Sequence, residues 1–545
     1  MLVLLQKTVG EIVREQAKLF PEVEAYVYPE HGIRKTYKQF DEETDELAKA
    51  FMGMGIAKGE HVAIWSDNKR QWLLSQYATG KMGATLVTVN TNYQAAELTY
   101  LLQQSESTTL ILDEDYKGTS YVEIVKAICP EAKLSEKGTI ESTTFPHLKR
   151  IILMTERTEQ GMYTWSELLH YAKDVSDEAL EERLQSLDPD DVINIQYTSG
   201  TTGFPKGVML THHNIVNNGK IIGDRMKLTE KDRVCIPVPF FHCFGCVLGT
   251  LAAVTHASTM VVIEQFEAEK VLQAVQDERC TALHGVPTMF IAELNHPKFA
   301  TFDTSSLRTG IMAGSTCPIE VMRKVIDVMG ADEITICYGQ TESSPVITQT
   351  TTDDPIEKRT STVGKPHPHV EVRVVEPATG EDAAVGTPGE LWTRGYHVMK
   401  GYYNNEEATR EAITADGWLR TGDIAIMDED GYLDITGRIR DMVIRGGENI
   451  YPREIEEFLY THPDVEDVQV VGVPDPKYGE ELMAWIIPKQ GKEVTEQTIR
   501  DFCQGNISHF KIPRYIQFTD AYPMTASGKI MKFKLQEMAK EQLVK

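Results

Sequence analysis

The chain has 545 residues, enough for more than one domain, and its 41% hydrophobic and 25% charged residues are typical of an ordinary soluble globular protein. The 81 acidic against 55 basic residues give a formal net charge of −26, which argues against a general affinity for nucleic acid or anionic membranes. The longest apolar runs are too short for a membrane span, the apolar start over 1–5 is too short for a signal peptide, and eight scattered cysteines predict reduced thiols in the cytoplasm.

Residues 1–190 alternate between helical and strand patterns, which predicts βαβ units and a parallel sheet. The expected elements, in chain order, are a helix over 41–55, a strand over 61–65, a helix over 72–81 and a strand over 85–89. Residues 131–146 are polar and lack periodicity, so we expect a surface excursion there.

The most informative stretch is 197–208, which contains four Ser/Thr hydroxyls, three glycines and one lysine. Residues 191–197 precede it, and their alternating polar and apolar side chains predict a strand. Such a loop suits a polyphosphate, because glycines let backbone N–H groups approach the oxygens while hydroxyls and a lysine donate further hydrogen bonds. The candidate phosphate-binding residues are Thr198, Ser199, Gly200, Thr201, Thr202, Gly203 and Lys206.

This stretch is not a Walker A loop, since Pro205 and Gly207 stand where that pattern needs glycine and a Ser or Thr. A polar surface loop is the alternative interpretation. Surface loops rarely concentrate hydroxyls in this way, which favours the phosphate-binding one.

His242 follows an apolar run over 235–241 and has aromatic neighbours. From the residues alone it is either a hydrogen-bonded core histidine or a functional one. Cys243 and Cys246 have C-x-x-C spacing, but no second Cys/His pair with finger-like spacing follows, so we do not expect a zinc site.

Two apolar segments, 284–290 and 310–316, are predicted strands that end in small residues. Small side chains at a strand end allow a flat ligand to lie against the backbone. The candidates at the end of the second segment are Gly314, Ser315 and Thr316.

The run Tyr338-Gly339-Gln340-Thr341-Glu342 follows a β-like segment over 334–337. The aromatic ring of Tyr338 can stack on adenine, the Thr341 hydroxyl can meet a phosphate, and the Glu342 carboxylate can hold Mg²⁺. A solvated glutamate after a loop is the alternative for Glu342.

Three further candidate site residues, all charged, lie towards the C-terminus. Asp423 follows a glycine in a turn, Arg438 precedes a charged segment, and Lys529 follows Gly528 in a loop. The segment 505–545 carries seven basic and three acidic residues, a local charge of 7 − 3 = +4. The last hundred residues have an α+β pattern, with strands predicted over 468–473, 482–487 and 515–518 and a helix over 495–504.

In this order the motifs resemble those of the adenylate-forming superfamily, which includes acyl-CoA synthetases, the adenylation domains of peptide synthetases and beetle luciferases. The resemblance runs from the loop at 197–208 to Lys529, and the chain looks closest to medium-chain fatty acyl-CoA synthetases. It implies an α/β N-terminal domain over 1–438, with parallel and mixed sheets and flanking helices. It also implies a small mobile α+β domain over 439–545 that carries the catalytic lysine, with a hinge at Arg440 or Asp441.

The resemblance implies a role for each candidate. The loop residues and Lys206 would hold phosphates, Gly314, Ser315 and Thr316 would border the nucleotide, and Asp423 and Arg438 would bind the ribose. His242 would line the carboxylate end of the acyl pocket, and Lys529 would bridge the carboxylate and the nucleotide. Gly447 would line the passage for the pantetheine of CoA, although a turn with positive φ is an alternative reason for a glycine there.

The expected function is an ATP-dependent fatty acid–CoA ligase that uses ATP, Mg²⁺ and coenzyme A. Its partners would be small-molecule substrates, without nucleic acid and without an integral membrane segment, and both a monomer and a homo-oligomer stay open. One alternative is an acyl-AMP ligase that delivers to a separate carrier protein, since nothing resembling a carrier domain follows Lys529. A second alternative is a luciferase-like oxygenase. A third is an inactive nucleotide sensor, and such a sensor would be expected to lack Lys529 or Glu342.

Overall fold

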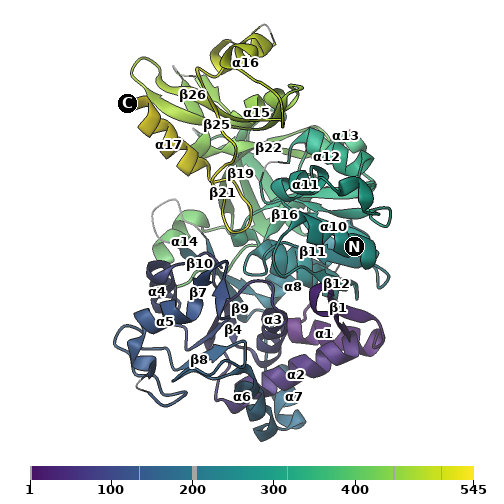
Figure 1. Ribbon diagram of the computed structural model, residues 1–545, viewed down its shortest axis with the longest axis vertical. Coiled ribbons are helices and arrows are strands. Elements are labelled where there is room, and N and C mark those ends of the chain that lie inside the picture. The colour runs from purple at the N-terminus through teal and green to yellow at the C-terminus, as the bar shows by residue number, and fades with distance from the viewer. Residues whose placement is uncertain are drawn as a thin grey trace.

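The computed structural model describes residues 3–133, 135–198, 205–315, 317–377, 379–445, 448–504, 506–507 and 509–544. Figure 1 shows an elongated molecule, with the N-terminal residues in its lower half, the middle of the chain at its centre and the C-terminal residues at its top. The described residues form four main sheets, of which the first two lie beside each other in the lower and middle parts of the view and the fourth lies at the top. No helix among these described ranges is long and apolar enough to cross a membrane.

The first sheet has the strand order β20-β10-β9-β4-β3-β5-β8. Its strands are β3 (His61–Trp65), β4 (Thr85–Thr88), β5 (Thr109–Leu112), β8 (Arg150–Leu153), β9 (Val192–Thr198), β10 (Lys206–Thr211) and β20 (Gly401–Tyr402). The strands from β9 to β8 are parallel, whereas β10 and β20 are added antiparallel at one edge. The parallel sheet predicted for the N-terminal residues is therefore confirmed.

The second sheet has the order β17-β16-β15-β14-β13-β11-β12-β1-β2 and is parallel from β15 to β1. Its strands are β1 (Glu24–Tyr28), β2 (Ile33–Thr36), β11 (Arg233–Ile236), β12 (Thr259–Val262), β13 (Ala282–Gly285), β14 (Thr309–Met312), β15 (Glu333–Gly339), β16 (Val346–Gln349) and β17 (Lys365–Pro366). The carboxyl ends of the parallel strands meet at one edge, where ligands bind in sheets of this kind.

Helices cover both sheets and share one apolar core between them. They are α1 (Val9–Leu19), α2 (Tyr37–Gly53), α3 (Arg70–Met82), α4 (Ala95–Gln104), α5 (Tyr121–Ile128), α6 (Trp165–His170), α7 (Asp177–Gln185), α8 (His212–Arg225), a π-helix (Phe244–Leu251) continued by α9 (Ala252–Val254), α10 (Ala268–Asp277), α11 (Pro287–Leu294), α12 (Ile319–Asp327) and α13 (Ile356–Ser361). Side chains of α2, α3, α8 and the π-helix join the inner faces of both sheets in one buried cluster, which includes Phe51, Trp72 and Phe240.

Two smaller sheets complete the fold. The third is antiparallel, in the order β18 (Val370–Val375), β19 (Gly389–Gly395), β21 (Leu419–Met427), β22 (Leu433–Arg438), with α14 (Glu406–Ala412) beside it. The fourth contains β23 (Val443–Arg445), β24 (Glu448–Ile450), β25 (Val465–Asp475), β26 (Gly479–Pro488) and β27 (Tyr515–Phe518), with α15 (Pro452–Tyr460), α16 (Glu496–Cys503) and α17 (Lys532–Val544). A separate two-stranded ribbon consists of β6 (Asp115–Tyr116) and β7 (Thr119–Ser120).

The strand predicted over 284–290 is wrong beyond Gly285. There β13 ends, and α11 begins at Pro287. Proline lacks the N–H that a strand ladder needs, but the first turn of a helix leaves that N–H unused, so proline favours the helix start. The second predicted strand also ends early, at Met312, and Gly314 has φ +91°, a conformation outside the strand region.

The alternation in residues 191–197 does predict a strand, but it does not separate a buried face from an exposed one. Asn194 and Gln196 of β9 are both buried. Asn194 Nδ2 donates to the Leu86 carbonyl at 3.0 Å, and Gln196 Nε2 donates to Asn194 Oδ1 at 2.7 Å. The polar side chains are tolerated in this central strand because each is hydrogen-bonded.

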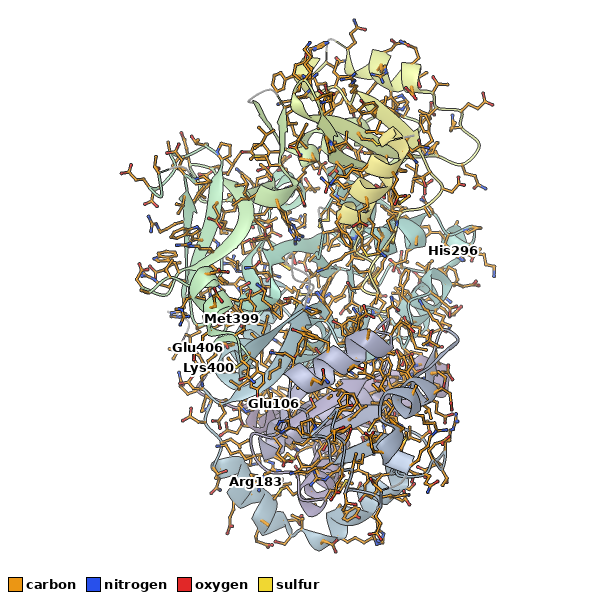
Figure 2. All side chains as sticks on the ribbon, turned by 90° about the vertical axis from the view of Figure 1, so that its left-hand side faces the viewer. Glu106, Arg183, His296, Met399, Lys400 and Glu406 are labelled. Atoms are coloured by element: carbon orange, nitrogen blue, oxygen red, sulfur yellow. The ribbon has the colours of Figure 1, made fainter. Side chains whose placement is uncertain are left out.

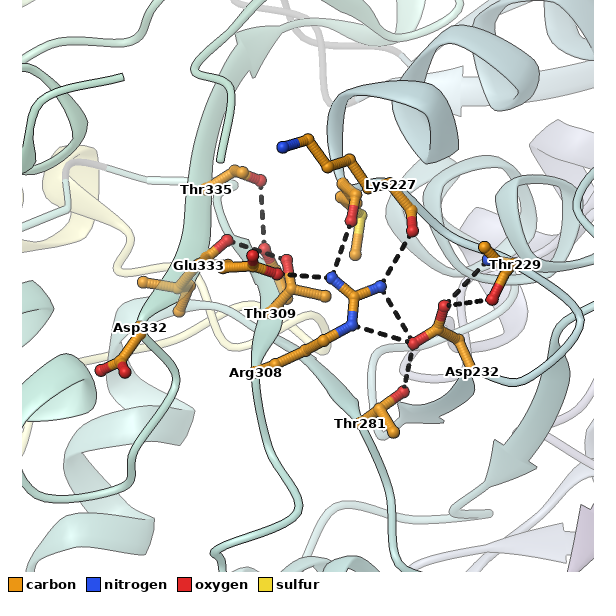
Figure 3. Close-up of polar contacts among 12 residues, drawn as sticks. Lys227, Thr229, Asp232, Thr281, Arg308, Thr309, Asp332, Glu333 and Thr335 are labelled. Carbon is orange, nitrogen blue, oxygen red and sulfur yellow. Dashed lines mark hydrogen bonds and ion pairs between the residues drawn. The ribbon is translucent and has the colours of Figure 1, made fainter. Parts of the chain in front are cut away.

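An arginine ties the amino ends of the parallel strands of the second sheet (Figure 3). Arg308 precedes β14, and each of its five N–H groups has an acceptor. The charged acceptors are Asp232, at 2.9 Å and 3.1 Å, and Glu333, at 2.6 Å; the carbonyls are those of Met226 and Lys227. This network holds strand ends opposite the edge where the candidate site lies.

Candidate active site

The two ends of the predicted phosphate-binding loop lie together at the carboxyl end of β9. Thr198 pairs with Lys206 across the antiparallel β9–β10 ladder. The Tyr100 hydroxyl of α4 donates to the carbonyl of Pro205 at 3.0 Å, which fastens the return of the loop. The predicted residues between them, Ser199, Gly200, Thr201, Thr202 and Gly203, lie outside the described residues, so their roles stay predictions.

Lys206 and Glu342 contact the same tyrosine, Tyr402. The Lys206 Nζ lies 4.5 Å from the centroid of the Tyr402 ring, and the Tyr402 hydroxyl donates to Glu342 Oε1 at 2.8 Å. Tyr402 is not among the residues predicted from the sequence. Its only local signal is a Gly-Tyr pair, and nothing in the sequence indicates that this short strand adds to β10.

Asp423 connects β15 and β22, because residues of both elements contact its carboxylate. The Tyr338 hydroxyl donates to Asp423 Oδ2 at 2.6 Å, and Arg438 Nε lies 3.2 Å from Oδ1. Asp423 and Arg438 are direct partners in the β21–β22 ladder. Burial raises the pKa of Asp423, while the charge of Arg438 and the Tyr338 hydrogen bond oppose this rise.

Lys529 reaches from the loop before α17 to His242, which precedes the π-helix. The Lys529 Nζ lies 3.2 Å from His242 Nε2. Burial and the adjacent Lys529 charge lower the pKa of His242 well below its usual value. Burial also lowers the pKa of Lys529, and the charge of Arg438 lowers it further. The structure therefore favours a neutral imidazole at His242.

The Lys529 loop is held by hydrogen bonds within itself and to α11. Thr525 Oγ1 accepts the Lys529 N–H at 3.0 Å, and the Thr525 N–H donates to the Lys529 carbonyl at 2.7 Å. The Thr288 hydroxyl donates to the Gly528 carbonyl at 3.0 Å. Gly528 has φ +79°, so the turn that presents the lysine uses a conformation that favours glycine.

Gly314 lies beside Lys529. A Cβ added at Gly314 would meet Lys529 Cε at 3.2 Å and Val286 Cγ1 at 3.1 Å, so a larger residue would crowd the lysine. Ser315 follows it and is exposed. Two further predicted residues, Thr316 beside the nucleotide and Gly447 in the pantetheine passage, lie outside the described residues, so their roles stay predictions.

The two cysteines after His242 have different neighbours. Cys243 Sγ lies 3.8 Å from the hydroxyl of Thr341, which is buried beside Glu342, and Gln196 Nε2 donates to Cys246 Sγ at 3.1 Å. The structure thus brings most of the sequence-predicted residues to one region, at the carboxyl ends of β9, β14 and β15. The segments that meet there carry ten of the predicted residues, which are Thr198, Lys206, His242, Gly314, Tyr338, Thr341, Glu342, Asp423, Arg438 and Lys529.

Two family matches cover most of the chain. The AMP-binding enzyme family matches residues 13–403, and the AMP-binding enzyme C-terminal domain matches residues 454–529. Among solved structures, the anthranilate CoA ligase AuaEII in complex with anthranoyl-AMP has a TM-score of 0.87 at 25% identity, covering 100% of this chain and 99% of the other. A fatty acyl CoA synthetase of Mycobacterium tuberculosis has a TM-score of 0.73 at 29% identity, covering 98% and 99%.

Curated relatives align over almost the whole chain. The protein named "Putative acyl-CoA synthetase YngI" of Bacillus subtilis is 58% identical, over 98% of this chain and 97% of the relative. The medium-chain acyl-CoA ligase ACSF2, mitochondrial, of Bos taurus is 43% identical, over 99% of this chain and 89% of the relative. The arrangement of the site, the fold and these matches together show that the chain belongs to the AMP-binding enzyme family and, within it, to the acyl-CoA synthetases.

Proposed function

We propose that this protein is an ATP-dependent fatty acid–CoA ligase with a preference for medium-chain acids, acting through an acyl-adenylate. The observation that carries the proposal is the contact of Lys529 with His242, because it brings a cation from the C-terminal part of the chain to the predicted carboxylate end of the acyl pocket. The proposal includes a domain boundary between residues 438 and 439. Lys529 would act in only one of the two steps of the reaction, so residues 439–545 would have to move as a separate domain.

In the first step, a carboxylate oxygen of the acid attacks the α-phosphorus of ATP. An O–P bond forms, the bond from the α-phosphorus to the bridging oxygen breaks, and pyrophosphate leaves with that electron pair. Negative charge grows between the carboxylate and the phosphate, where Lys529 donates. One well-placed donor of this kind lowers the barrier by about 3–4 kcal/mol, a factor of about 10²–10³ in rate.

The ribose would be held by Asp423, whose two oxygens accept from the ribose hydroxyls. Tyr338 and Arg438 fix the orientation of this carboxylate through the contacts at 2.6 Å and 3.2 Å. Fixing the acceptor before substrate arrives reduces the entropy lost on binding.

Glu342 fits a hard cation such as Mg²⁺. Its carboxylate is half-buried, Tyr402 donates to Oε1, and Oε2 has no hydrogen-bond donor among the described residues, which leaves an oxygen for a metal. A magnesium ion held there would supply positive charge against the departing pyrophosphate.

In the second step, the thiol sulfur of CoA attacks the carbonyl carbon of the acyl-adenylate. A C–S bond forms, the C–O bond to the phosphate breaks, AMP leaves, and the thiol proton passes to solvent. CoA needs a path to this carbon, so residues 439–545 would rotate about Arg440 or Asp441 and withdraw Lys529. The rotation would bring Gly447 to the pantetheine passage.

The preference for medium chains is supported by the name of the Bos taurus relative, a medium-chain acyl-CoA ligase, and by apolar side chains near the lysine. Val286 and Met289 lie beside Gly528, and Val286 and Phe244 lie beside Gly314. Two apolar residues of the segments 235–241 and 310–316 lie in packed cores. Phe240 packs against Trp72 in the core between the sheets, and Met312 lies in the outer core of the second sheet.

The test measures pyrophosphate release with a panel of carboxylic acids, with CoA and without it. A fatty acid–CoA ligase should release about one pyrophosphate per enzyme without CoA and turn over continuously with it. Turnover that requires a phosphopantetheinylated carrier protein instead of CoA would support the acyl-AMP ligase. Absence of pyrophosphate with every fatty acid would reject the proposal.

A further inference from the structure

We propose that Tyr402 is a positioning residue that links the phosphate-binding lysine, Lys206, to the metal-binding carboxylate, Glu342. The inference rests on the roles proposed above for these two residues. In that mechanism Tyr402 touches neither ATP nor the acid. It acts through Lys206 and Glu342, the two groups that meet the pyrophosphate end of ATP.

The two ends of the Tyr402 side chain make different interactions. Its ring face lies under the Lys206 ammonium, 4.5 Å from Nζ to the centroid, which is within the range of a cation–π interaction. Its hydroxyl donates to Glu342 Oε1 at 2.8 Å, a charge-assisted hydrogen bond. One side chain thus fixes the separation between a cation and an anion that must act on the same polyphosphate.

The backbone around Tyr402 is held on both sides. Its N–H donates to Thr409 Oγ1 at 2.9 Å, and Tyr402 pairs with Val208 where β20 adds to β10. The next residue, Tyr403, donates its N–H to the Gly207 carbonyl at 2.8 Å. Tyr402 as a whole residue is only 7% exposed, so the ring has little freedom to leave Lys206.

The segment that carries Tyr402 also touches Glu342 directly. Met399 donates its N–H to the Glu342 carbonyl at 2.9 Å. Figure 2 labels Met399 and Lys400 where this segment crosses towards the first sheet, above Glu106. Glu106 accepts from the Tyr403 hydroxyl at 2.9 Å, which anchors the far side of the same segment.

The pairing of Lys206 with a ring has a chemical consequence. Within the described ranges, Lys206 makes no ion pair, although acidic residues outnumber basic ones by 81 to 55 along the chain. A lysine that rests on a neutral ring has no carboxylate partner to leave when a phosphate arrives. On Glu342, the hydroxyl occupies one oxygen and leaves the other for the metal.

Two substitutions separate the two interactions. Tyr402→Phe removes the hydrogen bond to Glu342 and keeps the ring, whereas Tyr402→Leu removes both. Tyr403→Phe is the matched control, because it deletes a neighbouring tyrosine hydroxyl that donates to Glu106 instead. The measurements are ATP affinity by calorimetry with and without Mg²⁺, the Mg²⁺ dependence of pyrophosphate release, and conversion of supplied acyl-AMP and CoA to acyl-CoA.

For Tyr402→Phe we expect the Mg²⁺ concentration at half-maximal rate to rise about three- to tenfold, with ATP affinity in the absence of Mg²⁺ unchanged, since one charge-assisted hydrogen bond is lost. For Tyr402→Leu we expect ATP affinity without Mg²⁺ to fall about fivefold as well. Tyr403→Phe should change neither, and all three variants should convert supplied acyl-AMP at the parental rate.

An unchanged Mg²⁺ requirement in Tyr402→Phe would overturn the proposal. So would an equal loss of both half-reactions with a lower melting temperature, since that result indicates a packing role alone. Calorimetry reads the link in ATP and Mg²⁺ binding even if no fatty acid is turned over. Failure of the proposed function would therefore appear in the parental enzyme, and failure of this inference in the variants.

Discussion

The Nζ of Lys529 lies 3.2 Å from Nε2 of His242, although the two residues are 287 positions apart in the chain. The contact joins the loop after the fourth sheet to the start of the π-helix in the core between the first two sheets. Both side chains are half-buried and both have a lowered pKa, because burial and a neighbouring positive charge oppose protonation; a negative charge that enters between them would offset this effect. A substrate carboxylate would supply that charge.

Lys529→Ala should slow acyl-adenylate formation by about 10²–10³, because it removes the donor to the charge that develops in that step. Conversion of supplied acyl-AMP and CoA to acyl-CoA should stay close to the parental rate. Rapid-quench measurement of each half-reaction checks this. Lys492→Ala, on an exposed lysine that pairs with Asp464 within the C-terminal region, is the control for a lost surface charge. Equal losses in both half-reactions would contradict the proposed role of Lys529.

Gly447→Leu distinguishes the two explanations for this glycine, which are a place in the pantetheine passage and a turn with positive φ. A leucine in the pantetheine passage should block thiol entry, so the variant would release one burst of pyrophosphate and form almost no acyl-CoA. If Gly447 only serves a turn with positive φ, the substitution should strain the C-terminal region and lower stability. The burst amplitude and the melting temperature, measured together, decide between these results.

Acyl chain length should control kcat/KM until the apolar pocket ends. Each buried methylene contributes about 0.8 kcal/mol, which corresponds to about a fourfold rise per carbon. We expect an optimum at medium chains, with little activity towards acetate or amino acids. A series of straight-chain acids assayed under kcat/KM conditions tests this, and a clear preference for acetate, an amino acid or an aromatic acid would contradict it.

Arg308→Ala should lower the free energy of unfolding by about 2–4 kcal/mol, because it leaves the buried Asp232 carboxylate without its cation. Arg308→Lys should fall between Ala and the parent, since an ammonium cannot reproduce five donors in a plane. Arg323→Ala, in an exposed pair with Glu320, should cost less than about 0.5 kcal/mol. Urea unfolding followed by fluorescence gives these values. Equal effects of Arg308→Ala and Arg323→Ala would contradict a stabilising role of the Arg308 network.

Asp67→Asn should stabilise the protein in a pH-dependent way. Burial raises the pKa of Asp67 to about 6, and within the described part of the chain only Oδ2 has a hydrogen-bond donor, Gln265, at 2.7 Å. A raised carboxyl pKa adds stability below its unfolded value near 3.8 and loses it as pH rises through about 6. The gain from Asn should therefore be small at pH 4 and reach about 1–3 kcal/mol above pH 7.

The measurement for Asp67 is the melting temperature of both proteins from pH 4 to pH 8. Asp115→Asn, at an exposed position on β6, is the control and should show no such rise. A constant difference between Asp67→Asn and the parent across this range would show that the carboxyl does not titrate on folding as described.

Local sequence patterns predicted most of the strands and helices named above and the chemical groups of the candidate site. Strands over 61–65 and 515–518 were predicted with their observed bounds, because a run of β-branched and apolar residues between turn residues needs no distant partner to be recognised. The candidate residues carry groups suited to phosphates, a ribose and a metal, and that suitability is local. A strand–helix boundary such as Pro287 was missed, since the apolar run continues through it.

Which of these groups come into contact depends on how the strands are ordered in the folded chain. Periodicity reports which face of a strand is apolar but not which strand lies beside it, so the addition of β20 to β10, and with it Tyr402 between Lys206 and Glu342, could not be read from the chain. The same limit hid the burial of Asn194 and Gln196 in a central strand and the full set of acceptors around Arg308. Each depends on strand order and register, which long-range packing sets.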